Sequence, residues 1–276
     1  MSEGAEGVDV PTIMAALYGD GIVSRQAAFD RGFIASLDEQ IAALFEEARA
    51  TKGGAMPRGP NRYYVELQPE RLDGFVEIVS HPWFVAVVTA VLGRDYKIVE
   101  FGFDIPLPGA QDQPWHRDFP ADSRNATGYR LSSLAFNLTT VDTRQDHGPF
   151  EIAPGTQWDD IGQAKAGMFP VAENWDRYRE QAVQKLPQRG DISARSGLTI
   201  HRGTANRSDE PRPVLIVGVV AADVADADVH MLEVTAGYLK QVPQAVREHL
   251  FCRVVDHAGP IRQRHMIEGL LAAGYG

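Results

Sequence analysis

The sequence predicts a mainly β fold with flanking helices. Between about residues 96 and 222, short β-like segments alternate with turn residues, whereas the segments before and after this stretch carry apolar residues at helical spacing. Several short strands of this kind favour a sandwich or a barrel. A chain of 276 residues is long enough to bury a substantial core, and we expect a single domain over 1–276.

The N-terminal part, about residues 10–93, is predicted to be helical. Helices are expected over 10–17 and 27–50, and in the second of them Phe33, Leu37 and Ile41 form an apolar stripe that faces a core. Glycines and prolines predict a loop over 51–61. Two further helices, near 69–80 and 82–92, each begin at a proline, a residue suited to the first helical turn.

The strand-rich core is predicted over about 96–222. In the segment 131–138 apolar and polar residues alternate, so that Ser133 and Asn137 share one face and could line a cavity. A helix is expected near 173–185, and C-terminal helices over about 233–272. The predicted strands are Tyr96–Leu107, Arg130–Leu138, Phe150–Ala153, Asp191–Ala194, Leu198–His201 and Arg212–Ala221.

Composition excludes several classes of function. The chain has 27 Lys and Arg against 37 Asp and Glu, a formal net charge of −10, and no basic run, which argues against binding to nucleic acid or to a membrane surface. Cys252 is the only cysteine, so an intramolecular disulfide and a thiolate zinc site are excluded. The acidic N-terminus is unlike a signal peptide, and the longest apolar run, about 213–222, is too short to span a bilayer. We therefore expect a cytoplasmic protein. The composition does not indicate its oligomeric state.

The segment from Gln113 to Pro120 carries the strongest chemical signal. Its prolines disfavour a helix, and in an extended chain His116 and Asp118 project to the same side. A third metal ligand could be His201, which ends an apolar run 85 residues further on. Two histidines and one carboxylate form the facial triad typical of non-haem Fe(II).

An arginine stands 11 residues beyond His201. A hairpin around 208–211 would return Arg212 alongside the strand that carries His201. A guanidinium in such a place offers a planar, bidentate donor pair to a carboxylate. The other histidines lie in turns, at helix starts or in the C-terminal region, where surface roles are expected.

At four places the sequence resembles the phytanoyl-CoA dioxygenase-like branch of the Fe(II)/2-oxoglutarate-dependent oxygenases. The resemblance covers roughly residues 10–222, and its specific part is the spacing of the His-x-Asp, His and Arg residues. The four places are Pro108-Gly109-Ala110 leading through Gln113 to Trp115-His116-Arg117-Asp118, Gly148-Pro149-Phe150 running into Pro154-Gly155-Thr156-Gln157, Gly190-Asp191, and the block from His201 to Arg212 that contains Asn206 and Ser208.

The resemblance implies a double-stranded β-helix core, also called a jelly-roll or cupin-like core, and a small-molecule substrate. It implies Fe(II) held by His116, Asp118 and His201, and 2-oxoglutarate bound at its distal carboxylate by Arg212. With dioxygen, such an enzyme hydroxylates or otherwise oxidises an unactivated C–H bond and releases succinate and carbon dioxide. The net charge of −10 directs the substrate prediction toward a small neutral or cationic metabolite.

The sequence departs from the family pattern beside His201. Many relatives have a serine two residues after this histidine, where this chain has Gly203 followed by Thr204, so Thr204 and Ser208 become the candidates to assist Arg212. Candidate substrate contacts are Trp115, Arg117, Asn137 and Arg202, with Arg58, Asn61, Arg124 and Arg130 further away in sequence. Variable loops such as 51–61 and 119–129 are expected to set specificity.

Three alternatives remain open at the level of sequence. His116 and Asp118 could form a surface pair while His201 packs in a core. The same three ligands could hold zinc in a hydrolase, although a hydrolase has no need of an anchor such as Arg212. A non-catalytic jelly-roll protein that binds a metal or a ligand would share the fold without turnover.

Overall fold

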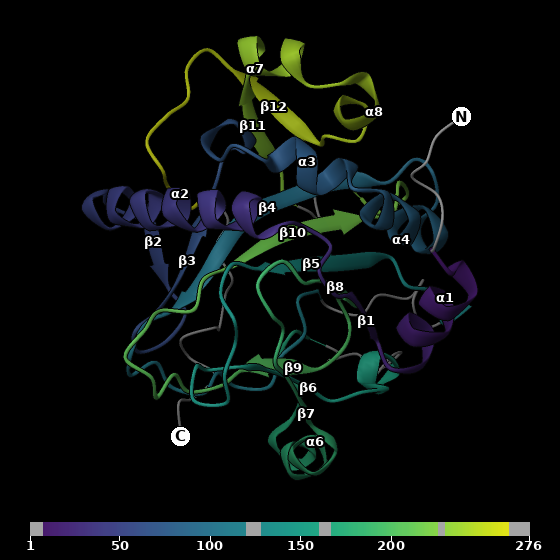
Figure 1. Cartoon of the computed structure of the whole chain (residues 1–276). Coiled ribbons are helices and arrows are strands. Elements are labelled where there is room, and N and C mark those ends of the chain that lie inside the picture. Colours follow the sequence, from purple (N-terminus) through teal and green to yellow (C-terminus); the bar gives the residue numbers. More distant parts are fainter. Residues whose placement is uncertain (1–7, 120–127, 160–166, 226–229, 265–276) are drawn as a thin grey trace.

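Two antiparallel sheets form the centre of the molecule, with the smaller sheet below the larger one in Figure 1. The computed structural model describes residues 8–119, 128–159, 167–225 and 230–264. The large sheet has the order β1-β8-β5-β10-β4-β3-β2, and the small sheet the order β7-β6-β9. The mainly β prediction is confirmed. The strands are β1 Ile22–Arg25, β2 Ala55–Pro57, β3 Arg62–Glu66, β4 Lys97–Pro106, β5 Ser133–Thr139, β6 Phe150–Ile152, β7 Val183–Lys185, β8 Ile192–Ser196, β9 His201–Gly203 and β10 Val214–Val220.

Helices cover one face of the large sheet. Aromatic side chains of the helices meet those of the strands in one core cluster: Phe75 lies 4.8 Å from Phe101 and Phe84 lies 4.1 Å from Phe136, measured between ring centroids. Because side chains alternate along a strand, the opposite face is left to polar residues such as Asn137. That polar face looks toward the small sheet. The N-terminal helices are α1 Val10–Gly19, α2 Arg31–Ala50, α3 Phe75–Ser80 and α4 Pro82–Leu92.

The N-terminal helices lie near their predicted positions, but the helix predicted over 27–50 begins four residues later, at Arg31, because Asp30 caps it. Asp30 accepts hydrogen bonds from the backbone N–H groups of Gly32 and Phe33 at the start of α2. The helix predicted near 69–80 is divided into a 3₁₀ turn, η1 Pro69–Arg71, and α3. Between them Gly74 has a φ of 100°, a conformation that interrupts a helix.

Three strands of the large sheet are not predicted from the sequence. β1 forms one edge of the large sheet and β2 with β3 the other, and β2 lies inside the segment predicted as a loop. Each of these strands has no more than five residues, and their contacts with β8 and β4 join segments that are far apart in sequence. Strands this short leave little periodic signal.

The predicted hairpin between His201 and Arg212 is wrong. β9 pairs with β6 in the small sheet, whereas β10 lies between β4 and β5 in the large sheet. The connection therefore crosses from one sheet to the other, and β9 occupies 201–203 instead of 198–201. Asn206 stabilises the crossing by donating from its side-chain amide to the carbonyls of Pro106 and Glu210.

The prediction of helices from about residue 233 onward is wrong for two segments. They form β11 Leu232–Thr235 and β12 Cys252–Val255, a parallel pair, with short helices α7 Ala236–Gln241 and α8 Gln244–Arg247 between them. The predicted positions 265–272 lie outside the described residues. The helix predicted near 173–185 is shorter, α6 Trp175–Gln181, preceded by the 3₁₀ turn η3 Ala172–Asn174 and followed by β7. A further 3₁₀ turn, η2 Thr156–Trp158, follows β6.

In the described part of the chain, every helix is too short or too polar to cross a lipid bilayer.

Candidate metal centre and cavity

The two predicted histidine ligands lie side by side. His116 and His201 form an antiparallel bridge, in which each backbone N–H donates to the carbonyl of the other at 3.0 and 2.9 Å. Asp118 returns to the same side as His116, and its Oδ1 lies 3.4 Å from Nε2 of His201. One ligand atom from each of the three residues lies within 4.8 Å of the others. The structure thus brings the predicted triad together from β9 and from the segment that ends at Phe119.

Hydrogen bonds orient both imidazoles for metal binding. Nδ1 of His116 lies 2.9 Å from the carbonyl oxygen of Pro114, and Nδ1 of His201 lies 2.9 Å from that of Thr199. Since a carbonyl only accepts, each Nδ1 carries the proton and each Nε2 has a free lone pair. Backbone carbonyls in this role fix the tautomer of histidine ligands in many metal sites.

The charges at the triad match a divalent metal. Burial, with His201 beside it, lowers the pKa of His116 to about 3, and burial together with Arg195 lowers the pKa of His201. Burial alone would raise the pKa of Asp118, but Arg195 and the two histidines outweigh it and hold that pKa well below its usual range. Two neutral imidazoles and one carboxylate result, which is the donor set that non-haem Fe(II) sites use.

Arg195, which the sequence analysis did not single out, is the direct neighbour of the triad. Its Nη2 donates to Oδ2 of Asp118 at 2.6 Å and its Nη1 donates to the side-chain oxygen of Asn137 at 3.1 Å. The guanidinium also lies 5.1 Å from the ring centroid of Phe150. Alternation along β8 places Arg195 on the polar face, but the partner of its charge lies 77 residues away and no local pattern reveals it.

The triad opens into a cavity of about 340 Å³ between the two sheets. This volume is within the range of small-molecule sites. Asn137 and Arg212, both predicted from the sequence, contribute to its wall. Other polar lining residues include Arg58, Arg62, Tyr64, Glu100, Asp104, Gln113, Arg195 and His230, and apolar ones include Phe119, Phe150, Met168 and Ile216.

Arg212 presents a desolvated guanidinium to this cavity. The residue is 4% exposed, and its Nε donates to the carbonyl of Gly148 at 2.9 Å. Burial and the neighbouring Arg62 lower the pKa of Arg212 to about 10, so the group is charged at neutral pH. Among the described residues no carboxylate forms an ion pair with it. A buried cation without a counter-ion is suited to receive a carboxylate.

A second arginine, Arg62, occupies the space beside Gly203, the position at which the family pattern predicts a serine. A Cβ atom on Gly203 would lie 2.2 Å from Nη1 of Arg62, so the guanidinium fills the space of any side chain at position 203. Arg62 is itself held by Asp104 at 2.9 Å and by the carbonyl of Thr204 at 2.8 Å. The departure from the family pattern therefore has a structural counterpart at the Arg212 end of the cavity.

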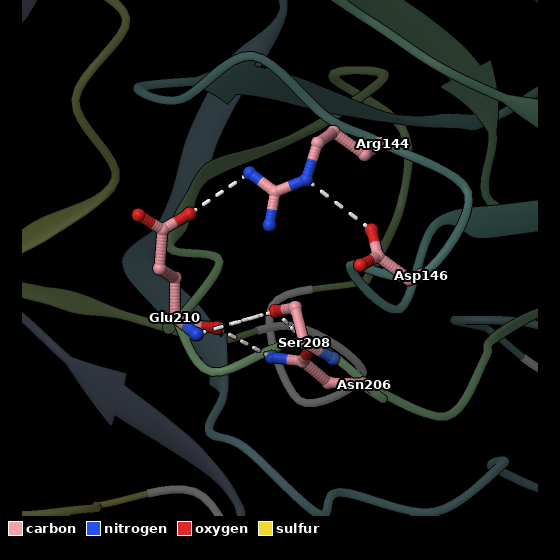
Figure 2. Close-up of polar contacts among 5 residues, drawn as sticks. All are labelled: Arg144, Asp146, Asn206, Ser208 and Glu210. Carbon is pink, nitrogen blue, oxygen red and sulfur yellow. Dashed lines mark hydrogen bonds and ion pairs between the residues drawn. The ribbon is translucent and has the colours of Figure 1, made fainter.

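Thr204 and Ser208 are engaged in the crossing loop. The Thr204 hydroxyl donates to the carbonyl of Pro149 at 2.7 Å. Figure 2 shows the Ser208 hydroxyl hydrogen-bonded within the loop to Asn206 and to the backbone carbonyl of Glu210. The side chain of Glu210 accepts a hydrogen bond from Arg144. Neither Thr204 nor Ser208 is among the described residues that line the cavity.

Three candidate substrate contacts lie on the far side of the metal-ligand segment. Trp115 and Arg117 alternate with His116 along the chain and point away from it. Trp115 is 1% exposed, and the guanidinium carbon of Arg202 lies 4.6 Å from a Trp115 ring centroid. The Arg117 side chain donates a hydrogen bond to the carbonyl of Asp159. In the described structure these three residues are outside the cavity wall.

The remaining candidates are dispersed. Arg58 lines the cavity, Asn61 donates to the carbonyl of Pro108, and Arg130 pairs with Asp223. Arg124 and most of the loop 119–129 lie outside the described residues. Sequence reasoning missed Arg62, Tyr64, Glu100 and Asp104, because β3 was not predicted and the polar face of β4 was not recognised.

Comparisons with known proteins agree with this geometry. Residues 18–214 match the family described as Phytanoyl-CoA dioxygenase (PhyH). The chain is 29% identical over 143 residues to the dioxygenase andF of Emericella variicolor, a match that spans 49% of this chain and only 46% of that protein.

Solved structures share the fold at low identity. The non-haem alpha-ketoglutarate-dependent carbocyclase SnoK from nogalamycin biosynthesis has a TM-score of 0.64 at 18% identity, covering 81% of this chain and 88% of its own. EctD from S. alaskensis, solved with 2-oxoglutarate and 5-hydroxyectoine, has a TM-score of 0.62 at 14% identity, covering 80% of this chain and 79% of its own. These likenesses show a common jelly-roll fold. From the family match over most of its length, the chain belongs to the phytanoyl-CoA dioxygenase family.

Proposed function

We propose that this Fe(II)- and 2-oxoglutarate-dependent dioxygenase hydroxylates an unactivated C–H bond of a small-molecule metabolite. The observation that carries the proposal is the pairing, in one cavity, of a His-Asp-His triad with a buried arginine that has no carboxylate partner among the described residues. The triad residues would hold the iron, and Arg212 would bind the distal carboxylate of 2-oxoglutarate.

The protein would contribute binding, orientation and charge. When bound, iron and 2-oxoglutarate supply the oxidising chemistry, in which dioxygen is consumed and 2-oxoglutarate is converted to succinate and carbon dioxide. His116 and His201 donate neutral Nε2 lone pairs, and Asp118 supplies one negative charge. Arg212 fixes the co-substrate at the end opposite to its reacting carbons, since its two terminal nitrogens match the two oxygens of a carboxylate.

A small-molecule substrate suits the size and the wall of the cavity. About 340 Å³ between two sheets holds a metabolite and not a folded partner. Phe119 and Phe150, with Met168, provide apolar surface next to the triad, which helps to exclude water from the site. SnoK is described as a carbocyclase and EctD was solved with a hydroxylated product, so the same fold serves more than one outcome. Hydroxylation is the outcome that we propose here.

The test measures succinate release from 2-oxoglutarate in the presence of Fe(II), ascorbate and a panel of metabolites. Asp118→Ala should abolish release that depends on a metabolite, because the metal loses its only anionic protein ligand. Arg212→Ala should raise the 2-oxoglutarate concentration for half-maximal rate by about tenfold or more, the value of a charged hydrogen-bonded contact.

Matched controls lie on the exposed helix α6. Asp176→Ala and Arg179→Ala remove an aspartate and an arginine that form an ion pair at the surface. Neither variant should change the succinate release or the 2-oxoglutarate concentration for half-maximal rate. Normal release by Asp118→Ala with iron bound would refute the proposal. Conversion of a metabolite with zinc bound, without consumption of 2-oxoglutarate, would favour a hydrolase. Metal binding without conversion of any metabolite would favour a binding protein.

A further inference from the structure

Among the described residues, one carboxylate in the cavity has no arginine or lysine partner. Among the described lining residues, Asp118 and Asp104 are each paired with a buried arginine, at 2.6 and 2.9 Å. Glu100 forms no ion pair in this part of the chain, and its Oε1 accepts a hydrogen bond of 2.6 Å from the hydroxyl of Tyr64. The cavity thus contains an anionic group that the protein does not neutralise by direct contact.

Tyr64 fixes this carboxylate in place. The phenol ring is 3% exposed, and the guanidinium carbon of Arg58 lies 4.6 Å from its centroid. Burial, reinforced by the charge of Glu100, raises the pKa of Tyr64 well above its usual value, so the hydroxyl keeps its proton and donates a hydrogen bond to Glu100. One oxygen of the carboxylate is therefore engaged, while the other is available to a ligand.

Two glycines allow the side chains of Tyr64 and Glu100 to lie directly against the backbone of the large sheet. A Cβ atom on Gly102 would stand 2.7 Å from the Tyr64 hydroxyl oxygen, and one on Gly218 would stand 2.8 Å from Oε2 of Glu100. Both distances are below those of real Cβ contacts, so Tyr64 lies over β4 and Glu100 lies over β10. The second oxygen of Glu100 thus lies over Gly218, on the side of β4 that faces β10 and β5.

The register of the large sheet places Glu100 in the row of residues that leads to the metal centre. Glu100, Gly218, Ala135 and Arg195 share one row across β4, β10, β5 and β8, and the last of them holds the ligand Asp118. Arg212 precedes Gly218 by six residues, at most about 20 Å of extended chain. The cavity therefore has a cationic end and an anionic group on the row of the metal centre.

We propose that Glu100 is the specificity residue for the substrate and that it binds a cationic nitrogen, as in a protonated amine or an amidinium. This proposal rests on the proposed function, since it assigns a chemical class to the metabolite that is oxidised. Oε2 of Glu100 accepts a charged hydrogen bond from the substrate, and Tyr64 acts as a positioning residue. The negative net charge of the chain favours the approach of such a molecule.

The test uses the anaerobic enzyme loaded with Fe(II) and 2-oxoglutarate, whose visible absorption band changes when a molecule binds next to the metal. Tyramine, tryptamine and cyclohexylamine are titrated, each against its neutral N-acetyl derivative. At least one amine should bind about tenfold or more tightly than its derivative, as expected for a charged hydrogen bond in a desolvated site. Glu100→Gln should reduce this preference to about twofold or less.

Controls separate this proposal from the proposed function and from misfolding. Glu100→Gln keeps the size of the side chain and an oxygen that accepts from Tyr64, so it should still form the absorption band. Glu46→Gln, on the exposed side of α2, should keep the preference of the wild-type enzyme. Tyr64→Phe should lower the preference without abolishing it, because the charge remains while its anchor is lost.

Loss of the absorption band in the wild-type enzyme would refute the proposed function and not this assignment alone. A wild-type enzyme that forms the band but binds no amine more tightly than its N-acetyl derivative would overturn the assignment of a cationic substrate. So would a Glu100→Gln variant that keeps the full preference.

Discussion

At the scale of single residues, the orientation of Asp118 depends on Arg195. Arg195 binds one carboxylate oxygen of Asp118 while the other oxygen faces His201. The same guanidinium is fixed from a second side by Asn137. A ligand held in this way is preorganised, because its rotamer and its charge are both set before a metal arrives.

Replacing Arg195 by methionine should weaken metal binding by about 10–100-fold, the usual effect of losing a partner of a metal ligand. The carboxylate of Asp118 then loses the hydrogen bond that orients it. Calorimetric titration of the metal-free protein with Co(II) measures the affinity directly, without turnover.

Arg202→Met is the matched control for this change. Arg202 also stacks on an aromatic ring and pairs with acidic residues, but it does so on the far side of the metal-ligand segment. The control should bind Co(II) as the wild-type chain does. An unchanged affinity in Arg195→Met would show that Asp118 is oriented by other contacts.

Residue-scale prediction from the sequence succeeded where the signal was local. His116 and Asp118 stand two positions apart in an extended segment, so their common side follows from backbone geometry. Arg62 and Arg195 act through partners 42 and 77 residues away, which only the pairing of strands brings close. Charged residues on predicted strands give no indication of their partners before the strand order is known.

At the scale of elements, the large sheet separates two environments. Its helix-covered face carries the aromatic core, and its other face carries the charged lining of the cavity. Strand periodicity in 131–138 predicts this division from the sequence. It does not predict that β9 and β10 belong to different sheets, because a turn-rich connection is compatible with a hairpin and with a crossing.

Gly102 is the tightest point of the sheet next to the cavity. A Cβ atom there would lie 2.4 Å from the carbonyl oxygen of Val65, which belongs to the backbone of β3 and cannot rotate away. We expect Gly102→Ala to lower the free energy of unfolding by about 1–3 kcal/mol, the usual cost of overpacking. Urea denaturation measures this change.

The control for this substitution is Gly237→Ala in α7, where an added Cβ would be 3.9 Å from its nearest neighbour. That variant should be as stable as the wild-type chain or slightly more so, because alanine favours a helix. Equal stability of both variants would mean that β3 can move away from β4 at no cost.

At the scale of the whole molecule, the acidic composition affects the approach of ligands, whereas the buried histidines affect how stability depends on pH. The net charge of −10 concerns the approach of ligands, and it leaves the fold undetermined. The C-terminal region illustrates the limit of composition and periodicity, since β11 and β12 pair with each other across two short helices. Parallel strands need a connection that returns the chain to the end where the first strand began, and local periodicity does not show such a connection.

The stability of the metal-free protein should decrease as the pH falls below about 6.5. Burial lowers the pKa of four histidines, His81, His116, His147 and His201, in the folded chain. Below pH 6.5 the folded chain binds fewer protons at these positions than the unfolded chain, so acid favours unfolding. Between pH 6.5 and 5 the expected loss is on the order of 1 kcal/mol for His116, whose pKa in the folded chain is lowered to about 3.

Urea midpoints at pH 7.5, 6 and 5, with a chelator present, measure this dependence in a range above the ordinary pKa of carboxyl groups. The double variant His116→Asn and His201→Asn should show a shallower decrease, because two of the four proton-binding sites of the unfolded chain are gone. An equally steep decrease in the double variant would assign the effect to His81 and His147. A midpoint that rises on acidification would contradict the neutral, metal-ready state of the two imidazoles.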